Sequence, residues 1–502
     1  KEARATGNVA ITHERIFATA GEAVLLPSEN RLFLSDSPKI TDKKSGASVE
    51  GYKLEFTKGN STATALSSPD KKIRAKARII SESGGKKQTT TIYANSIKMV
   101  NSDDKNTFYF SGKVHVSSAE FQAFADEIVA VSDNSSASQK YAISKITGKG
   151  NVEFTRDAWR ATSKRIEIYP EKGEAWLEQN ARLADSKKGI TLRAHEIVMT
   201  KDDGRATAFG DRSKPDSFVY VDIAQSSGLG LPKQSAKNTR IKSRSLMASW
   251  QNKNVFLKFT RDVEVSSEDL RATCGFVDVY AQEDAQKGGS QVKKIEAYGD
   301  VVVSQDGSQA LAQIAKIYPR VEISGKSGKT SHRFAEFLTD PDQPSLRPKM
   351  ILPEIENIGL SQKSKDAKIK KTEIVSDRQS YVSGEINDTY LFEDNVEIAG
   401  TDFAASCARI EVSIKPEKAG KLQIAQISLI KNLKISQGGR LATAGRADIN
   451  PINETVALTE NPQVQNDDGS KASGSRMVYT RGRQNISIEN PRITLPPIGA
   501  SK

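Results

Sequence analysis

Residues 112–133 read GKVHVSSAEFQAFADEIVAVSD, a pattern that alternates apolar and polar side chains in two successive registers. A turn-forming pair opens the pattern, and Val114 and Val116 then share one face of a period-two strand. Ala123 follows nine residues after Val114, and a second apolar alternation begins at Ile128. The step from Ala123 to Ile128 is odd, so these side chains keep one face only if an extra residue bends the chain. We therefore predict that the turn pair starts a strand and that a bulge or corner follows Ala123.

The same pattern recurs along the chain. The strings that share the turn pair and the apolar alternation are GNVAI (7–11), GKVHV (112–116), GNVEF (150–154), RDVEV (261–265), GDVVV (299–303), DNVEI (394–398) and KNLKI (431–435). Nine residues beyond the first apolar residue of each string stand Ala18, Ala123, Ala161, Ala272, Ala310, Ala405 and Ala442. Strands of about nine residues between turns, without sustained helical periodicity, predict an all-β fold of stacked layers. The fold is expected to be an elongated β-solenoid or an open β-jelly roll.

The spacing of these alanines indicates modules of two long elements and one short element. Ala123 and Ala161 are 161 − 123 = 38 residues apart, and Ala194 follows after 194 − 161 = 33 residues. Prolines interrupt 338–350, where another short element is due, and they are incompatible with a central strand. We predict, in chain order, a partial module at 1–105, a module at 106–210, a linker or insertion at 211–245, a module with a degenerate third element at 246–375, and a module at 376–502. Within the module at 246–375, the Pro- and Lys-rich segment 340–375 is a second candidate insertion.

The composition suits thin, half-exposed strands. Hydrophobic residues make up 37% of the 502 and charged residues 27%, which is too apolar for a disordered chain and polar for a thick globular core. No stretch approaches roughly eighteen uncharged apolar residues, so no membrane-spanning helix is predicted. The chain begins at Lys1 without an apolar leader, and we expect that an export signal has been removed. The net charge of +12 favours phosphorylated lipids, nucleic acid or anionic surfaces as partners, or serves solubility alone.

The GNV openings, the strands around each alanine and the turns SDSPKI (35–40), TENPQV (459–464) and ENPRI (489–493) together resemble the OstA-like domain of the LptA family of periplasmic lipopolysaccharide-transport proteins. The resemblance covers most of the chain. It implies a V-shaped pair of antiparallel sheets whose apolar interior holds acyl chains, in a periplasmic bridge between an inner-membrane exporter and an outer-membrane barrel. The implied partners are lipopolysaccharide or a related acyl lipid, other envelope transport components, and further copies of the chain bound end to end. Family members are usually shorter, so this chain is expected to bridge with fewer copies.

The inward apolar columns supply the candidate lipid site, although the same side chains also suit a closed core. Taken with the resemblance, the groove candidates are Val114, Val116, Phe121, Ala123, Ile128, Val152, Phe154, Trp159, Ala161, Ile166, Ile168, Val263, Val265, Leu270, Ala272, Val277, Val301, Val303, Val396, Ile398, Phe403 and Ile410. Basic residues in KKIRAKAR (71–78) and RGRQ (481–484) suit either lipid phosphates at a groove rim or a solvated strand edge.

Catalytic and metal chemistry is not indicated. The four histidines, His13, His115, His195 and His332, lie at unrelated repeat positions, and carboxylates are spread along outward strand positions. Cys274 and Cys407 are 407 − 274 = 133 residues apart in equivalent inward positions of different modules, so we expect two free, buried thiols. We expect no cofactor, no metal, no nucleic-acid partner and no enzymatic activity. Two other functions stay open: a structural or adhesive envelope rod with a closed core, and a carbohydrate-active β-solenoid enzyme.

Overall fold

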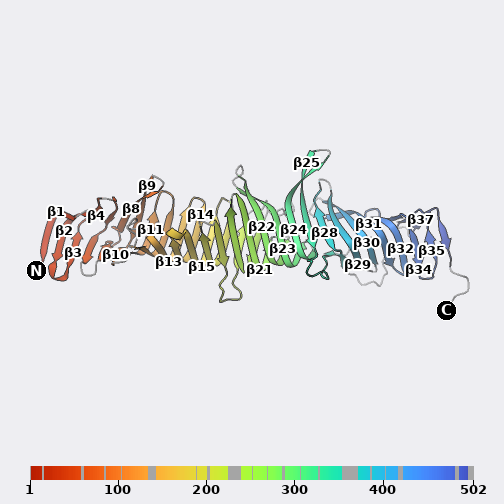
Figure 1. The fold of residues 1–502 in the computed structure, drawn as a ribbon, viewed down its shortest axis with the longest axis horizontal. Helices are drawn as coiled ribbons and strands as arrows, with labels where there is room; N and C mark the ends of the chain where they lie inside the picture. The colour runs from red at the N-terminus through yellow and green to blue at the C-terminus, as the bar shows by residue number, and fades with distance from the viewer. Residues whose placement is uncertain are drawn as a thin grey trace. The chain divides into compact units, whose positions relative to one another are not determined.

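The computed structural model describes residues 2–13, 16–43, 45–57, 62–83, 86–102, 105–133, 143–187, 189–200, 204–223, 239–251, 253–267, 270–284, 289–305, 307–325, 328–352, 371–384, 387–401, 403–416, 422–480 and 485–495. The chain forms two compact units, one of residues 1–223 with 244–250 and one of residues 224–243 with 251–502. Among the described residues the helical segments are two 3-10 turns, η1 (Pro27–Glu29) and η2 (Pro170–Lys172). The remaining regular structure is β-strand, which confirms the predicted all-β class (Figure 1). No helix in the described ranges is long and apolar enough to cross a membrane.

The first unit contains β1 (Ala3–His13), β2 (Ile16–Leu26), β3 (Arg31–Ser35), β4 (Lys39–Asp42), β5 (Ser48–Glu50), β6 (Lys53–Thr57), β7 (Thr62–Leu66), β8 (Ala75–Ser83), β9 (Lys86–Ala94), β10 (Ser96–Asn101), β11 (Lys105–Ser117), β12 (Gln122–Asp133), β13 (Ile143–Arg156), β14 (Trp159–Tyr169), β15 (Glu174–Asp185), β16 (Ile190–Thr200), β17 (Arg205–Phe209), β18 (Val219–Ile223) and β20 (Ser245–Gln251).

The second unit contains β19 (Thr239–Ser243), β21 (Asn254–Ser266), β22 (Leu270–Asp284), β23 (Gly289–Gln305), β24 (Ser308–Gly325), β25 (Gly328–Leu338), β26 (Lys349–Leu352), β27 (Thr372–Val375), β28 (Arg378–Val382), β29 (Asp388–Gly400), β30 (Phe403–Pro416), β31 (Leu422–Gln437), β32 (Arg440–Asn450), β33 (Thr455–Thr459), β34 (Gln463–Asn466), β35 (Lys471–Ser473), β36 (Arg476–Thr480), β37 (Asn485–Glu489) and β38 (Arg492–Thr494).

Each unit is a stack of antiparallel strands in which the long strands are bent at a corner. In β11 the pairing with β12 shifts register between Ser111 and Val114, and in β13 the pairing with β14 shifts between Lys149 and Val152. The predicted bend after the repeat alanine is confirmed, because β12 shifts against β13 between Phe124 and Glu127. Elsewhere a layer is made in two pieces: β3 and β4 both pair with β2, and β17 and β18 both pair with β16. Each layer therefore has one strand segment before the corner and one after it. The segments before the corners stack into one sheet face of the unit, and the segments after the corners stack into the other.

The turn-forming pairs of the repeat lie at these corners. In β13, Gly150 and Asn151 have φ of +68° and +46°, and in β29, Asp394 and Asn395 have φ of +61° and +49°. Gly, Asn and Asp tolerate this left-handed region better than other residues, which explains the composition of the pairs. The prediction that each pair starts a strand is wrong, because each lies within a long strand. In a hairpin this left-handed conformation reverses the chain. In this protein it bends a single strand, so that the strand passes from one face of the unit to the other.

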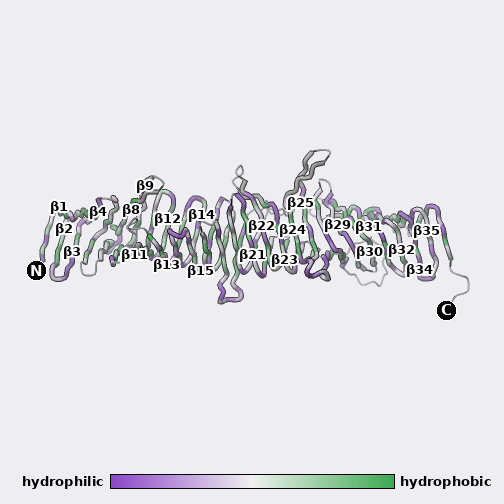
Figure 2. The backbone as a smooth tube through the Cα atoms, viewed as in Figure 1, coloured by the Kyte–Doolittle hydropathy of each residue, from purple (hydrophilic) through white to green (hydrophobic). Residues whose placement is uncertain are grey.

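Apolar side chains from both faces pack together inside each unit. In the first unit one buried cluster includes Ala18 and Val114 on one face and Leu34 and Phe110 on the other. In the second unit a buried cluster runs from Val301 to Tyr479. Apolar stretches lie within the strands and hydrophilic stretches gather in the connecting loops (Figure 2). The core is therefore a long, thin layer between two faces, as expected for stacked strands.

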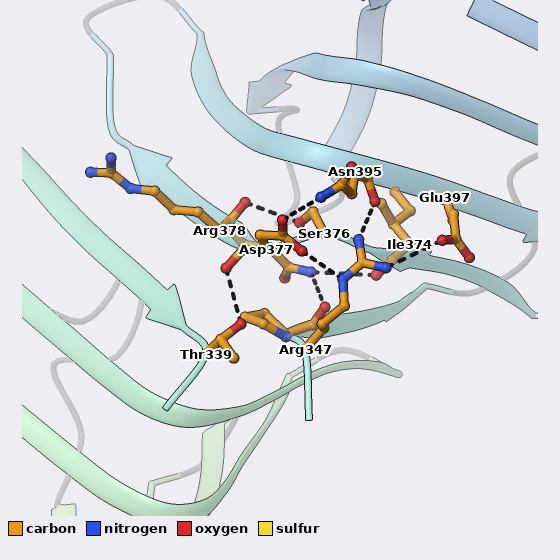
Figure 3. A network of polar contacts seen from close by, with 10 residues as sticks. Thr339, Arg347, Ile374, Ser376, Asp377, Arg378, Asn395 and Glu397 are labelled. Carbon is orange, nitrogen blue, oxygen red and sulfur yellow. Dashed lines mark hydrogen bonds and ion pairs between the residues drawn. The ribbon is translucent and has the colours of Figure 1, made fainter. Parts of the chain in front are cut away.

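Two of the segments that break the repeat lie beside corners. The Pro-rich residues 339–348 connect β25 to β26, and the described part of segment 211–245 includes β18 and β19. In the first of these segments Arg347 pairs with Asp377 at 2.7 Å and with Glu397 at 3.2 Å, and it donates to the backbone carbonyl of Asn395 (Figure 3). We call Arg347, Asp377, Asn395 and Glu397 the corner clasp. The clasp joins three successive layers at their bend.

Candidate functional site

Inward apolar rows cross the strands from β11 to β16. On one face, directly opposed residues form the row Val116, Ala123, Phe154, Ala161, Leu183 and Leu192. On the other face, Phe110, Ile128, Gly148, Ile166, Leu177 and Ile197 form a second row. Cross-strand neighbours of this kind lie about 5 Å apart, so each row is a continuous apolar strip. The inward residues predicted from the period-two alternation are thus opposed to one another across neighbouring strands.

The groove candidates differ in burial from position to position. Next to the corner, Val114 and Val152 are 1% and 5% exposed, whereas Val116 and Phe154, two residues further along, are partly exposed. The buried candidates are Val114, Val152, Ala161, Val263, Val277, Val301, Val396, Ile398, Phe403 and Ile410. The partly exposed candidates are Val116, Phe121, Ala123, Ile128, Phe154, Ile166, Ile168, Val265, Leu270, Ala272 and Val303, and Trp159 is exposed. Val116 and Phe154 are therefore accessible to solvent beyond the corner on one face. On the other face Ile128 beside the corner is partly exposed, and Ala130 and Ser132 beyond it are buried.

Aromatic side chains line the open side in the first unit. The rings of Phe121 and Phe154 stack with centroids 5.5 Å apart, and Trp159 is 41% exposed at the start of β14. Because all three are large and apolar, leaving them in contact with water is unfavourable by about 25 cal/mol for each Å² exposed. A ligand with a long hydrocarbon chain would remove that contact.

Sequence reasoning missed several members of this surface. Phe108, Ile146, Leu183, Leu192 and Met199 are partly exposed. Strand pairing places Leu183 and Leu192 in the first row, and Phe108, Ile146 and Met199 in a third inward row parallel to the second. They lie before the repeat strings of β11 and β13 or in the less regular strands β15 and β16. Alternation counted from the corner would have predicted that these residues point inward. This count requires the position of the corner, which the sequence did not give.

The outward face of β14 carries a buried carboxylate. The Glu167 side chain is 11% exposed, accepts a hydrogen bond from the Tyr169 hydroxyl at 2.6 Å, and pairs with Lys145 at 2.9 Å and with Arg165. Burial alone would raise the pKa of this carboxyl, but hydrogen bonds from Tyr169, Arg165 and Lys145 outweigh it and lower the pKa to about 2. A group held ionised in this way stabilises the fold and is a poor general acid or base.

The remaining candidate residues lie in structural positions. Arg74, in the basic segment 71–78, donates to the Gly112 carbonyl at 3.3 Å, and Lys76 pairs with Glu50 at 2.7 Å. These contacts of segment 71–78 stabilise the corner at Gly112 and an outer face of the unit. The other basic segment, 481–484, lies outside the described residues. On the outer face His115 stacks between Tyr93 and Phe124. In the described ranges no group of three or more His, Cys, Asp and Glu side chains is arranged to hold a metal ion.

The two cysteines are free, as predicted. Cys407 is buried and Cys274 is partly buried, so the expected burial is complete for Cys407 alone. Burial raises the pKa of the Cys274 thiol to about 12 and that of the Cys407 thiol to about 11. Both side chains take small inward positions of the repeat beside a corner, at Val263 and Val396 respectively. Their place in the fold is that of small apolar packing residues.

Comparison with protein families connects this architecture to a function. The family described as LptA/(LptD N-terminal domain) LPS transport protein matches residues 91–205 in the first unit and residues 373–485 in the second. The comparison with curated proteins gives no match. Strands β21–β25 repeat the same bent layer outside both matched segments. Over the two matched segments the chain belongs to the LptA/LptD N-terminal-domain family, whose members are lipopolysaccharide-transport components of the cell envelope.

Proposed function

We propose that this protein carries lipopolysaccharide, or a related acyl lipid, by holding the acyl chains on the partly exposed inward rows of its strands. The observation that carries the proposal is the continuous apolar strip from Val116 to Leu192 with Phe121, Phe154 and Trp159 at its open side. The family match to a transport component supports it. The sugar and phosphate head group would stay in water, outside the strip.

Transport along such a surface needs no bond chemistry. Each CH₂ group that leaves water contributes roughly 0.8 kcal/mol, and this contribution does not depend on the direction of approach. Ile146, Ile168 and Ala175 are directly opposed on neighbouring strands, so a chain that moves from strand to strand meets similar apolar contacts. A cargo held by non-directional contacts can slide without breaking specific hydrogen bonds.

Site-specific photo-crosslinking tests this proposal. A diazirine analogue of leucine is placed at Ile128, which points inward, or at Val129, the adjacent residue of β12 that points outward. After incubation with lipopolysaccharide and irradiation, we expect a lipid adduct at Ile128 and none at Val129. Equal adducts at both positions, or no adduct at Ile128, would contradict binding on the inward face. Lipid that co-purifies with the unmodified protein, identified by mass spectrometry, gives an independent readout.

We further propose that the protein works in the periplasm as a bridge between envelope transport components and that copies associate end to end. The contact that we propose is a strand of a second copy paired with β1 on the edge opposite β2. Sedimentation across a concentration series checks the association: the average mass is expected to rise with concentration. A proline at Val9 or Ile11 of β1 should lower this rise, and a mass unaffected by concentration would contradict end-to-end contacts.

A structural role is favoured for one part of the chain. From β29 to β36 the inward side chains form a buried cluster that includes Phe403, Ile410, Leu429 and Met477. A closed core of this kind is what an envelope rod would need. We therefore assign lipid binding to the open rows and mechanical continuity to this closed section.

A further inference from the structure

We infer that the interior of strands β29–β36 is sealed against acyl chains, so that within the second unit lipid is held only on the layers that precede the corner clasp. This inference rests on the proposed function. It divides the family-matched segments into one with an open inward face, at 91–205, and one with a filled interior, at 373–485.

The burial of equivalent positions carries the inference. Ile410 and Leu429 are directly opposed in β30 and β31, and both are 0% exposed. Leu433 and Ile435, beyond the corner of β31, are 2% and 0% exposed. Val116, Ile128 and Phe154 of the first unit are partly exposed, whereas the residues at the same repeat positions in these strands, Ile398, Ile410 and Ile435, are 7%, 0% and 0% exposed.

The cause is the volume of the side chains that fill the interior. In the first unit Ile128 faces Gly148 across the strand pair, whereas in the second unit Ile410 faces Leu429. The next inward positions of the first pair of strands hold Ala130 and Ser132, and those of the second hold Val412 and Ile414. Large branched side chains close the space between the faces to core density. Glycine, alanine and serine leave Ile128 partly exposed.

The corner clasp stands at the boundary of the sealed section. It ties residues 339–348 and the β27–β28 corner to the corner of β29, the first strand of the proposed sealed section (Figure 3). Gln379, 1% exposed, adds a hydrogen bond of 2.9 Å from its side-chain amide to the Pro348 carbonyl. Thr339 donates to the Asp377 carbonyl at 3.2 Å. These bonds fix the bend of three adjacent layers, so the two faces beyond them cannot spread around a lipid without breaking the clasp.

Crosslinking at matched positions tests the sealed section. The diazirine leucine analogue is placed in the full chain at Ile128, at Ile410 or at Leu429, and each variant is irradiated with lipopolysaccharide. We expect adducts at Ile128 and about tenfold fewer at Ile410 and Leu429, the effect of losing contact with roughly two CH₂ groups. Equal adducts at all three positions would overturn the sealed section and leave the proposed function standing. Absence of adducts at every position would overturn the proposed function and this inference with it.

A filling variant separates side-chain volume from position in the chain. In Gly148→Leu the new Cβ would lie 2.8 Å from the Cγ2 of Ile166, so Ile166 must change its χ1 rotamer or shift slightly to make room. We expect this variant to lower the adduct at Ile128 about tenfold while the circular dichroism of the strands is unchanged. As a control, Lys149→Leu adds an apolar side chain at the neighbouring outward position and should leave the adduct unchanged. An Ile128 adduct that survives in Gly148→Leu would contradict the volume explanation.

Discussion

Replacing Glu167 with glutamine tests how the outer face of the open module is stabilised. The carboxylate is held between Lys145, Arg165 and Tyr169 on β13 and β14, with its side chain 11% exposed. Glutamine keeps the size of the side chain and removes its charge. We expect the variant to fold and to be less stable near neutral pH.

The magnitude follows from the depressed pKa. The pKa of Glu167 falls from an ordinary 4.5 to about 2 in the folded protein, and each unit is worth about 1.4 kcal/mol, so ionisation contributes about 3 kcal/mol. Because the folded value is the lower one, this contribution is complete above the unfolded pKa of 4.5 and is lost as the pH falls toward about 2. The difference in unfolding free energy between the wild type and Glu167→Gln should therefore shrink on acidification.

Urea unfolding followed by tryptophan fluorescence measures this difference locally. Trp176 lies directly opposite Glu167 on β15, and Trp159 lies on β14 itself, so with Trp250 replaced by phenylalanine in every variant the emission reports the layers that the substitution weakens. Local readout matters because layered proteins need not unfold in one step. The matched control, Glu171→Gln on the exposed η2 turn, should match the wild type at every pH. Equal midpoints for Glu167→Gln and the wild type near pH 7, or a difference that persists near pH 2, would refute the reasoning.

The corners and the thiols give two further predictions. Gly112→Ala is expected to cost about 2–3 kcal/mol, because φ is +79° and the new Cβ would lie 2.8 Å from the Cβ and Cγ of Asn95. Gly299→Ala should cost only about 1 kcal/mol, because φ is +75° but the nearest atoms are 3.7 Å away; thermal unfolding that reverses this order would contradict the steric account. Cys274 and Cys407, with pKa values raised to about 12 and about 11, should react with a disulfide reagent much more slowly in the native protein than in urea, and equal rates would count against burial.

The strand phase and the corner chemistry could be predicted from the sequence, but the position of the corner within a strand could not. Period-two alternation put Val152 and Phe154 on the inward face, where strand pairing confirms them opposite Ser163 and Ala161. The pair before Val152 was recognised as turn-forming, yet it was interpreted as the start of a strand. Left-handed backbone looks the same in sequence whether the chain reverses or only bends. A bend differs from a reversal because the residues after the pair stay hydrogen-bonded to the same neighbouring strand as the residues before it. That pairing is a long-range contact, which the local sequence does not reveal.

The sequence pattern also did not distinguish an open groove from a closed core, for a different reason. Val116 and Ile398 occupy the same place in the repeat, but Val116 is partly exposed and Ile398 is buried. Both are β-branched aliphatic residues at the end of the same five-residue string. Their burial is decided by side chains on other strands, whose opposition becomes known only with the pairing register.

The repeat therefore controls two properties separately. The left-handed pair and the small inward residue beside it, such as Ala125 or Cys407, set the bend and keep neighbouring layers in register whatever fills the interior. In our proposal, the side-chain volume at the positions of Gly148 and Leu429 then decides whether that interior admits an acyl chain. Because strand pairing does not depend on the filling, a chain built from one repeat can join lipid-accessible and sealed sections without a change of fold. In the function that we propose, interior volume rather than the repeat itself therefore distinguishes the stretches that hold lipid from those that do not.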